Sequence, residues 1–495
     1  MPKTLPIFYS ALLLTGVNLL LRLVGTSFQV YLSGRIGAAG IGLLQLVMSV
    51  NALALVAGMA GIRTGAMYLT AEELGRKRPQ RVIWVLSGCF LYSICFSGTI
   101  STLLYAFAPQ IADLWIGDLR TEASLRLFAA FLPCICLSGV MCGYFTAENR
   151  IGTLAAVEVA EQLCAMVVTI AALALWAGTD AARACQCVIL GNCIGACLTL
   201  GCLVVLRFRE KPEIGQPIPI RRRLTQTALP LAAADVLKAG INTTENLMVP
   251  KRLALNTLVD NPLAAFGCLS GMVFPVLMFP ACILFGLAEL LIPELARCAA
   301  GGKYQRIRYL VKRSLKVAML YGLLFGGLLI LLAEPLCLKL YDSTEAGTYL
   351  KLYALLVPML YCDALTDAMT KGLGQQTACV RYNIVTSAMD VAFLYLLLPG
   401  YGMKGYFASF LITHLVNFLL SLRRLLRISG LSIPFYLPAL SLAASVAAVA
   451  GASQINGSIG QCIAYCALLG SLLYLCRILG REDLQWLQSL LRTKK

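Results

Sequence analysis

Long apolar stretches fill this chain of 495 residues and leave only short gaps between them. Each stretch approaches or exceeds the roughly 20 apolar residues that an α-helix needs to cross the hydrocarbon core of a bilayer. We therefore predict an all-α polytopic membrane protein with about 14 transmembrane helices. The expected spans are 5–32, 40–62, 82–109, 124–147, 151–177, 182–206, 224–249, 263–293, 308–333, 346–371, 378–399, 403–422, 432–452 and 459–479.

The Lys and Arg residues predict how these helices are oriented. If both termini lie in the cytoplasm, 29 of the 41 basic residues fall in cytoplasmic segments and only 9 fall in outside segments. Because basic residues are enriched in cytoplasmic loops, we expect a multi-pass protein of the cytoplasmic membrane with both termini inside. Attraction to the headgroups of anionic membrane lipids accounts for the net charge of +17, so no nucleic-acid partner is expected.

Neither a leader peptide nor a metal or cofactor site is expected. The first apolar stretch is longer than a signal-peptide core, and no small-x-small cleavage pattern follows it, which favours an anchored first helix. The 20 Cys residues are scattered through the expected helices, where they act as small apolar side chains. In the densest group only Cys193 and Cys197 share a helical face, which disfavours metal binding.

An internal repeat relates the two halves of the chain. Gly65–Arg76 and Gly286–Arg297 agree at five of twelve positions, with an offset of 221 residues. Both segments end even-numbered helices, so the repeats are parallel, related by a pseudo-two-fold axis along the membrane normal, with a substrate site expected between the lobes. We predict an N-terminal lobe over 1–206, a cytoplasmic linker over 207–223, a C-terminal lobe over 224–427, and an appended helix pair with a cytoplasmic tail over 428–495.

The seventh expected span carries a polar stripe. Its members, spaced three, four and three residues apart, lie on one helical face: Asp235, Lys238, Asn242 and Glu245. Charges inside a bilayer are costly, so such a stripe is expected to face an aqueous cavity. Lys238 and Asn242 would then contact an anionic substrate, and the carboxylates Asp235 and Glu245 would bind H⁺ or Na⁺. The alternative is an internally neutralised Asp235–Lys238 pair that only packs the lobes.

Other intramembrane charges have competing interpretations. Asp363 and Asp367 are candidates for ion coupling, but Asp367 also precedes Lys371 at the spacing of an ordinary intrahelical ion pair. On the fifth span, one of Glu158 and Glu161 is either protonated or paired with Arg63 or Arg150.

Arg22 lies well inside the first expected span and Arg63 closes the second, and we assign both arginines to substrate binding. A guanidinium stays ionised and binds phosphate oxygens in bidentate fashion. Arg63 ends its helix and could instead reach the headgroups, whereas Arg22 lies too deep for this.

The chain shows no catalytic constellation. His414 is the only histidine, no Walker-type loop is present, and no expected outside loop is long enough for a domain. His414 is best read as an interhelical hydrogen-bonding residue. A transporter is therefore expected rather than an enzyme.

Three motifs in order resemble the oligosaccharide flippase family of the multidrug/oligosaccharidyl-lipid/polysaccharide exporter superfamily, in particular its stage V sporulation protein B-like branch. The first runs from Arg22 to Gly37, the second joins Gly143-Tyr144-Phe145 to Glu161-Gln162, and the third is Lys371-Gly372-Leu373-Gly374-Gln375. The resemblance implies a fold of the MATE (multidrug exporter) type with a V-shaped cavity between the lobes.

The resemblance also implies a function. The chain would flip a lipid-linked oligosaccharide, such as an undecaprenyl-pyrophosphate-linked peptidoglycan precursor for the spore cortex, by alternating access. Better-known lipid II flippases of the superfamily carry additional arginines in their first two helices, whereas 26–61 here contains only Arg35. Two alternatives stay open: a cation-coupled exporter of drugs or metabolites, and a membrane enzyme of wall-polymer synthesis.

Overall fold

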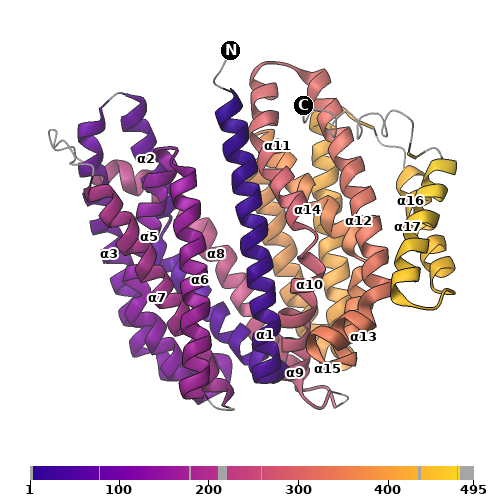
Figure 1. Cartoon of the computed structure of the whole chain (residues 1–495). Coiled ribbons are helices and arrows are strands. Elements are labelled where there is room, and N and C mark those ends of the chain that lie inside the picture. The colour runs from indigo at the N-terminus through magenta and orange to yellow at the C-terminus, as the bar shows by residue number, and fades with distance from the viewer. Residues whose placement is uncertain are drawn as a thin grey trace. The chain divides into compact units, whose positions relative to one another are not determined.

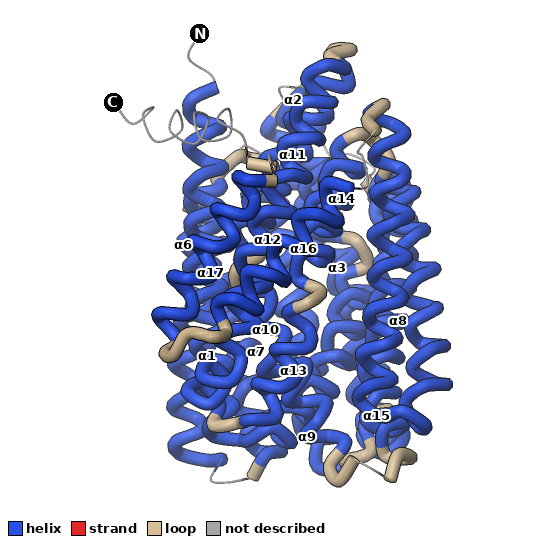
Figure 2. The backbone as a smooth tube through the Cα atoms, turned by 90° about the vertical axis from the view of Figure 1, so that its right-hand side faces the viewer, coloured by secondary structure: helices blue, strands red, loops and turns tan. Residues whose placement is uncertain are grey.

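The computed structural model describes residues 4–76, 78–177, 180–209, 220–257, 259–432, 436–476 and 478–479. Within these ranges all regular secondary structure is helical (Figure 2). The predicted all-α class is thereby confirmed. Most of the expected linker, 210–219, and the end of the tail, 480–495, lie outside the described residues.

Contacts divide the chain into two compact units, Met1–Gly271 with Asp390–Tyr406, and Met272–Met389 with Phe407–Lys495. The lobe and linker boundaries expected from the sequence stay a prediction. The helices of the first unit are α1 (Thr4–Met59), α2 (Ile62–Gly75), α3 (Val82–Ala106), α4 (Ala108–Gln110), α5 (Glu122–Ala147), α6 (Ile151–Ala172), α7 (Ala181–Phe208), α8 (Arg221–Leu253) and α9 (Pro262–Gly267). Those of the second are α10 (Phe274–Met278), α11 (Cys282–Ala300), α12 (Tyr304–Tyr341), α13 (Thr344–Ala354), α14 (Val357–Gly372), α16 (Tyr436–Ala452) and α17 (Ser458–Leu475), and α15 (Gln376–Ser429) contributes to both units.

Two long helices contain glycine breaks. In α1 the regular geometry is interrupted at Gly37, with φ 68° and ψ 176°, and in α15 at Gly402, with φ 57° and ψ −135°. A positive φ is easily adopted only by glycine, which has no Cβ. Each break falls in the gap between two expected spans, so α1 and α15 each include two of the predicted segments.

Two further apolar segments are broken into bent pairs. The helical axis bends by 64° between Met278 and Cys282, beside Pro280, and by 58° between α13 and α14. Pro358 occupies the first turn of α14, where its missing N–H leaves no helical hydrogen bond unmade. In the described residues, eight helices are long and apolar enough to cross a membrane, or ten if each bent pair is one span. The number fourteen stays a prediction.

The helices α16 and α17 pack against each other and against α12 (Figure 1). The buried Tyr465 on α17 is central to this packing, since its hydroxyl donates to the carbonyl of Leu323 at 2.6 Å and lies 3.0 Å from the Ser445 hydroxyl. A polar tip satisfied in this way permits an aromatic side chain to lie deep between helices. The pair is thus a packed addition to the second unit.

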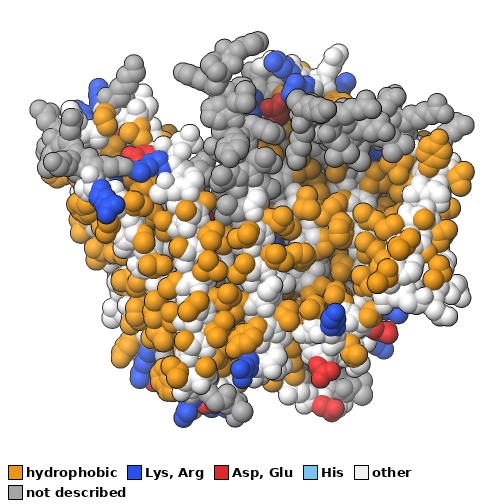
Figure 3. Space-filling view, in the orientation of Figure 1, with side chains coloured by type: hydrophobic (Ala, Val, Ile, Leu, Met, Phe, Trp, Pro, Cys, Tyr) orange, Lys and Arg blue, Asp and Glu red, His pale blue; other side chains and the backbone are white. Residues whose placement is uncertain are grey.

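The surface of the helices fits a lipid environment. On the face drawn in Figure 3, hydrophobic side chains cover the middle of the helices, and charged side chains gather towards the helix ends. A bilayer offers no hydrogen bonds in its core, so this distribution is the one expected of membrane-spanning helices.

The Gly143-Tyr144-Phe145 motif has a packing role in the first unit. Both aromatic side chains are buried in the core formed by α2, α3, α5 and the start of α8. A Cβ at position 143 would lie 2.4 Å from the carbonyl oxygen of Arg63, so only glycine permits α2 and α5 to approach so closely. The motif therefore fixes the start of α2, where Arg63 lies, so Arg63 begins a helix rather than ending one as predicted.

Candidate functional site

The predicted polar stripe lies on α8. The side chains of Asp235, Lys238 and Asn242 are exposed, whereas Glu245 is partly buried. Among the described residues no ion pair joins Asp235 to Lys238, which disfavours the internally neutralised pair. The first three residues of the stripe therefore present an open polar face, and Glu245 belongs to a different environment.

The carboxyl group of Glu245 lies beside that of Asp390 on α15. Asp390 is buried, with 6% of its surface exposed. Two carboxyl groups can share a hydrogen bond only when one of them carries a proton, because an ionised carboxylate has no donor. The structure thus places two carboxyl groups together inside the first unit.

A second polar site lies inside the first unit, between α1, α6 and α7. It is a cavity of about 370 Å³ whose lining includes Glu158, Glu161, Gln162 and Asn192. The guanidinium of Arg63 lies 3.7 Å from the Glu158 carboxylate. This is one of the pairings expected from the sequence, and it connects the start of α2 to the cavity.

The other polar residues of this cavity are held by neighbouring helices. The Thr199 hydroxyl on α7 donates to the Glu161 carboxylate at 2.6 Å, and the Gln162 amide donates to the carbonyl of Leu21 on α1 at 3.2 Å. Leu21 also lines the cavity, and Arg22 follows it as a half-buried residue. The structure thus brings the region of Arg22 and the Arg63–Glu158 pair to the same part of the first unit.

The second unit contains a separate acidic site on α14. The Asn417 amide on α15 donates to both oxygens of Asp363, at 3.1 and 3.4 Å, and the Thr386 hydroxyl lies 3.5 Å from the Asn417 amide oxygen. Asp367 instead pairs with Lys371 at 2.6 Å, the intrahelical pair considered from the sequence. Asp363 is the better candidate for ion coupling, since its neighbours in this cluster are uncharged.

His414 makes two contacts with Phe410, and its expected interhelical role stays a prediction. Its ring stacks on Phe410, with centroids 3.8 Å apart, and its Nδ1 lies 2.9 Å from the Phe410 carbonyl oxygen. These contacts lie within α15, so they are intrahelical.

Three partners in these sites were missed by reasoning from the sequence: Asp390, Thr199 and Asn417. Asp390 carries a detectable signal, because it is the only charged residue in the expected span 378–399 apart from Arg381 near its start. Thr199 and Asn417 carry no such signal, since neutral polar residues are common in membrane helices.

Comparisons with known proteins identify the class to which this fold belongs. The MatE family model matches residues 14–179. An inward-facing multidrug resistance MATE family transporter of the MOP superfamily has a TM-score of 0.68 at 14% identity, covering 85% of this chain and 100% of that chain. The lipid II flippase MurJ in its inward closed conformation has a TM-score of 0.74 at 13% identity, covering 94% of this chain and 100% of that chain.

The chain therefore shares its fold with this MATE family transporter and with MurJ, and the predicted MATE-like fold is confirmed. In sequence it is a homologue of stage V sporulation protein B of Bacillus subtilis (strain 168), with 22% identity over 415 residues that cover 80% of this chain and 78% of that protein. The predicted resemblance to the stage V sporulation protein B-like branch of the superfamily is thereby confirmed.

Proposed function

We propose that this protein is a flippase that moves a lipid-linked oligosaccharide across the cytoplasmic membrane by alternating access. The substrate would be an undecaprenyl-pyrophosphate-linked precursor of peptidoglycan or another polysaccharide, used in spore cortex or wall synthesis. The observation that carries the proposal is the similarity to stage V sporulation protein B over 80% of the chain. The fold shared with the lipid II flippase MurJ supports it.

In this proposal the pyrophosphate is bound by Arg22, Arg63, Lys238 and Asn242. Guanidinium and ammonium groups bind phosphate oxygens by charge-assisted hydrogen bonds. The exposed face of α8 supports a role for Lys238 and Asn242, and the position of Arg22 after Leu21, beside a polar cavity, supports its role. Arg63 would exchange its contact with Glu158 for the substrate.

Reconstitution tests the proposal. Vesicles containing the protein and a labelled lipid-linked oligosaccharide are assayed for exposure of the head group on the opposite side. We expect wild-type protein to flip the lipid, Arg22→Ala to reduce flipping to the rate of protein-free vesicles, and Arg35→Ala, on the same helix, to retain it. Protein-free rates for the wild type would contradict the function, and normal flipping by Arg22→Ala would remove Arg22 from the site.

Ion coupling is the second part of the proposal. We assign it to Asp235, Glu245, Asp363 and Asp367, with H⁺ or Na⁺ as the coupled ion. The neighbouring Glu245 and Asp390 carboxyl groups favour the proton, because two adjacent carboxyl groups can share a single proton. Proton and Na⁺ gradients imposed separately on the vesicles distinguish the two ions. We expect Asp390→Asn to abolish the response to a proton gradient, and an unchanged response would contradict this role.

A cation-coupled exporter is the competing function, and the acidic cavity at Glu158 and Glu161 is the observation that favours it. Carboxylates at such a site would attract an organic cation. Uptake of a fluorescent organic cation by the same vesicles, at rates that depend on Glu158 and Glu161 but not on Arg22, would support the exporter. The named relatives are transporters and flippases, so we propose no covalent reaction. Recovery of chemically unaltered lipid after the assay tests that statement against a wall-polymer enzyme.

The proposal also includes the orientation of the protein in the membrane. Both termini are placed in the cytoplasm, with the two predicted lobes rocking about the linker 207–223 to expose the site alternately.

A further inference from the structure

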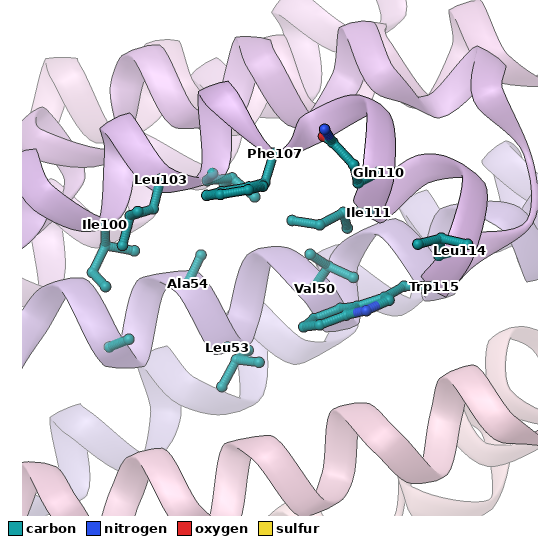
Figure 4. A pocket seen from close by; sticks show the side chains of 12 residues that line it. Val50, Leu53, Ala54, Ile100, Leu103, Phe107, Gln110, Ile111, Leu114 and Trp115 are labelled. Atoms are coloured by element: carbon teal, nitrogen blue, oxygen red, sulfur yellow. The ribbon is translucent and has the colours of Figure 1, made fainter.

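An apolar groove lies in the first unit, at the end of α3 and away from the polar sites. Its volume is about 370 Å³, and its walls come from the second half of α1 and from the segment that follows α3 (Figure 4). Figure 4 shows Phe107 and Ile111 on one side and Val50, Leu53 and Ala54 of α1 on the other, with the Trp115 ring beside Val50 and Leu53. The lining is almost entirely hydrocarbon and aromatic.

The shape of the groove depends on how α3 ends. Phe107 leaves helical geometry with φ −94° and ψ 6°, and after the short α4 the chain forms a π-helical segment, Ile111–Ile116, that ends at Gly117 with a positive φ. A π-helical turn is wider than an α-helical one, and such turns occur frequently at functional sites. Here it lines the groove with Leu114 and Trp115.

The groove walls are open to the surroundings. Exposed fractions are 47% for Leu103, 52% for Phe107, 66% for Leu114 and 46% for Trp115. Because the protein crosses a membrane, such large apolar side chains are solvated by acyl chains rather than by water. A hydrocarbon chain is therefore the ligand whose chemistry fits these walls.

A cation marks one end of the groove. The Lys251 ammonium on α8 donates a hydrogen bond to the carbonyl oxygen of Leu114, a lining residue. An ammonium has three donors and the carbonyl uses one, so two remain for an anion. Gln110 and the Trp115 indole add polar groups to the same lining, while the exposed Asp113 is not part of it.

We propose that this groove binds a membrane glycerophospholipid, with one acyl chain lying against the walls and the phosphate contacted by Lys251. The Lys251 ammonium at the rim complements the phosphate charge, and the lipid that we propose is phosphatidylglycerol, whose net negative charge no headgroup cation neutralises. The site is separate from the proposed substrate site and does not depend on the flippase function.

Tryptophan fluorescence tests the proposal on the full chain. A variant that keeps only Trp115, made by Trp84→Phe, Trp176→Phe and Trp486→Phe, is titrated in detergent with phosphatidylglycerol carrying brominated acyl chains, which quench indole fluorescence on contact. The matched control keeps only Trp176, which is 58% exposed and also lies in a π-helical segment, Leu173–Ala177. We expect saturable quenching of Trp115 and quenching of Trp176 that rises in proportion to the lipid fraction.

Two substitutions separate the parts of the site. Lys251→Gln should raise the half-quenching concentration about tenfold, the effect of losing one charge-assisted contact. Ala54→Leu should weaken binding by filling the groove without touching the cation, and gel filtration verifies that each variant is folded. Brominated diacylglycerol, which has no phosphate, should bind the unsubstituted groove as weakly as phosphatidylglycerol binds Lys251→Gln.

Three outcomes would overturn the proposal. Identical titrations for Trp115 and Trp176 would mean ordinary annular lipid. An unchanged half-quenching concentration in both Lys251→Gln and Ala54→Leu would mean that the quenching site is elsewhere. Displacement of the brominated lipid by undecaprenyl phosphate at lower concentrations than by unlabelled phosphatidylglycerol would assign the groove to a prenyl lipid instead.

Discussion

A buried carboxylate at the end of α2 shows how single residues hold the first unit together. Glu73 is 1% exposed, and Arg223 near the start of α8 lies 3.1 Å from its carboxylate and also contacts Glu72. Taking a charge out of water is costly, and a partner that is both cationic and hydrogen-bonded offsets this cost. The pair therefore fixes the position of α8 against α2.

We predict that Arg223→Gln destabilises the protein by about 3 kcal/mol, because it leaves the Glu73 carboxylate buried without its partner. Thermal unfolding in detergent measures the effect. The double variant Arg223→Gln/Glu73→Gln should recover much of the loss, since the buried charge is then also removed. Glu72→Gln is the matched control and should cost less, because Glu72 is more exposed. Equal losses for the single and double variants would show that the charge is not the cause.

Asp118 allows a prediction about pH. The Arg120 side chain donates hydrogen bonds to its carboxylate, which holds the pKa of Asp118 below its usual range, and the carboxylate also accepts from the Arg120 backbone N–H at 3.0 Å. A depressed pKa stabilises the folded state above the ordinary aspartate pKa, and this contribution is lost as the pH falls through the folded value. We expect Asp118→Ala to lower the free energy of unfolding by about 1 kcal/mol at pH 7.

The difference in the free energy of unfolding between Asp118→Ala and wild type should shrink below about pH 4, where the Asp118 carboxyl of the unfolded state becomes protonated. Unfolding curves at several pH values measure this. Asp113→Ala, which removes a nearby exposed acid, should show no comparable dependence. A difference that stays constant down to pH 2 would mean that the ionised carboxylate is not what stabilises this turn.

At the level of the helices, glycine decides where long apolar segments break. We predict that Gly37→Ala destabilises the protein by about 1–3 kcal/mol, the cost of placing an alanine at φ 68° and ψ 176°, a backbone conformation that essentially only glycine adopts. Position 37 has no atom within 4 Å of a new Cβ, so a loss there would come from the backbone alone. Denaturant unfolding of Gly37→Ala and of the helical control Gly34→Ala measures it. The control should be neutral or slightly stabilising, and matched losses would exclude the backbone explanation.

Features of the helices that have a local cause could be predicted from the sequence, and features that depend on distant residues could not. Hydropathy located the apolar segments because burial in lipid depends on about 20 consecutive residues. The bend beside Pro280 likewise has a local cause, since proline acts on its own turn. By contrast, Asp390 meets Glu245 across 145 residues of chain, and Asn417 meets Asp363 across 54. Pairings of that kind depend on tertiary packing, which the sequence pattern does not encode.

At the level of the whole molecule, the internal repeat is partly visible in the ion pairs. Glu73 and Glu294 occupy equivalent positions in the two repeats, and each pairs with an arginine near the start of a later helix: Arg223 at 3.1 Å and Arg306 at 2.7 Å. The partners are not equivalent, because Arg306 lies 12 residues from Glu294 and Arg223 lies 150 residues from Glu73. The shared feature is an acid towards the end of one helix that pairs with an arginine near the start of a later helix.

The charge distribution leads to a prediction about orientation. Because 29 of the 41 basic residues lie in segments assigned to the cytoplasm, we expect a fluorescent protein fused to the C-terminus to mature and fluoresce, and alkaline phosphatase fused there to be inactive. A phosphatase fused within the loop at Asp342, which the same assignment places outside, should be active. Reversal of both results would invert the membrane orientation. The polar face of α8 would then first meet substrate from outside, opposite to the direction of the proposed flipping.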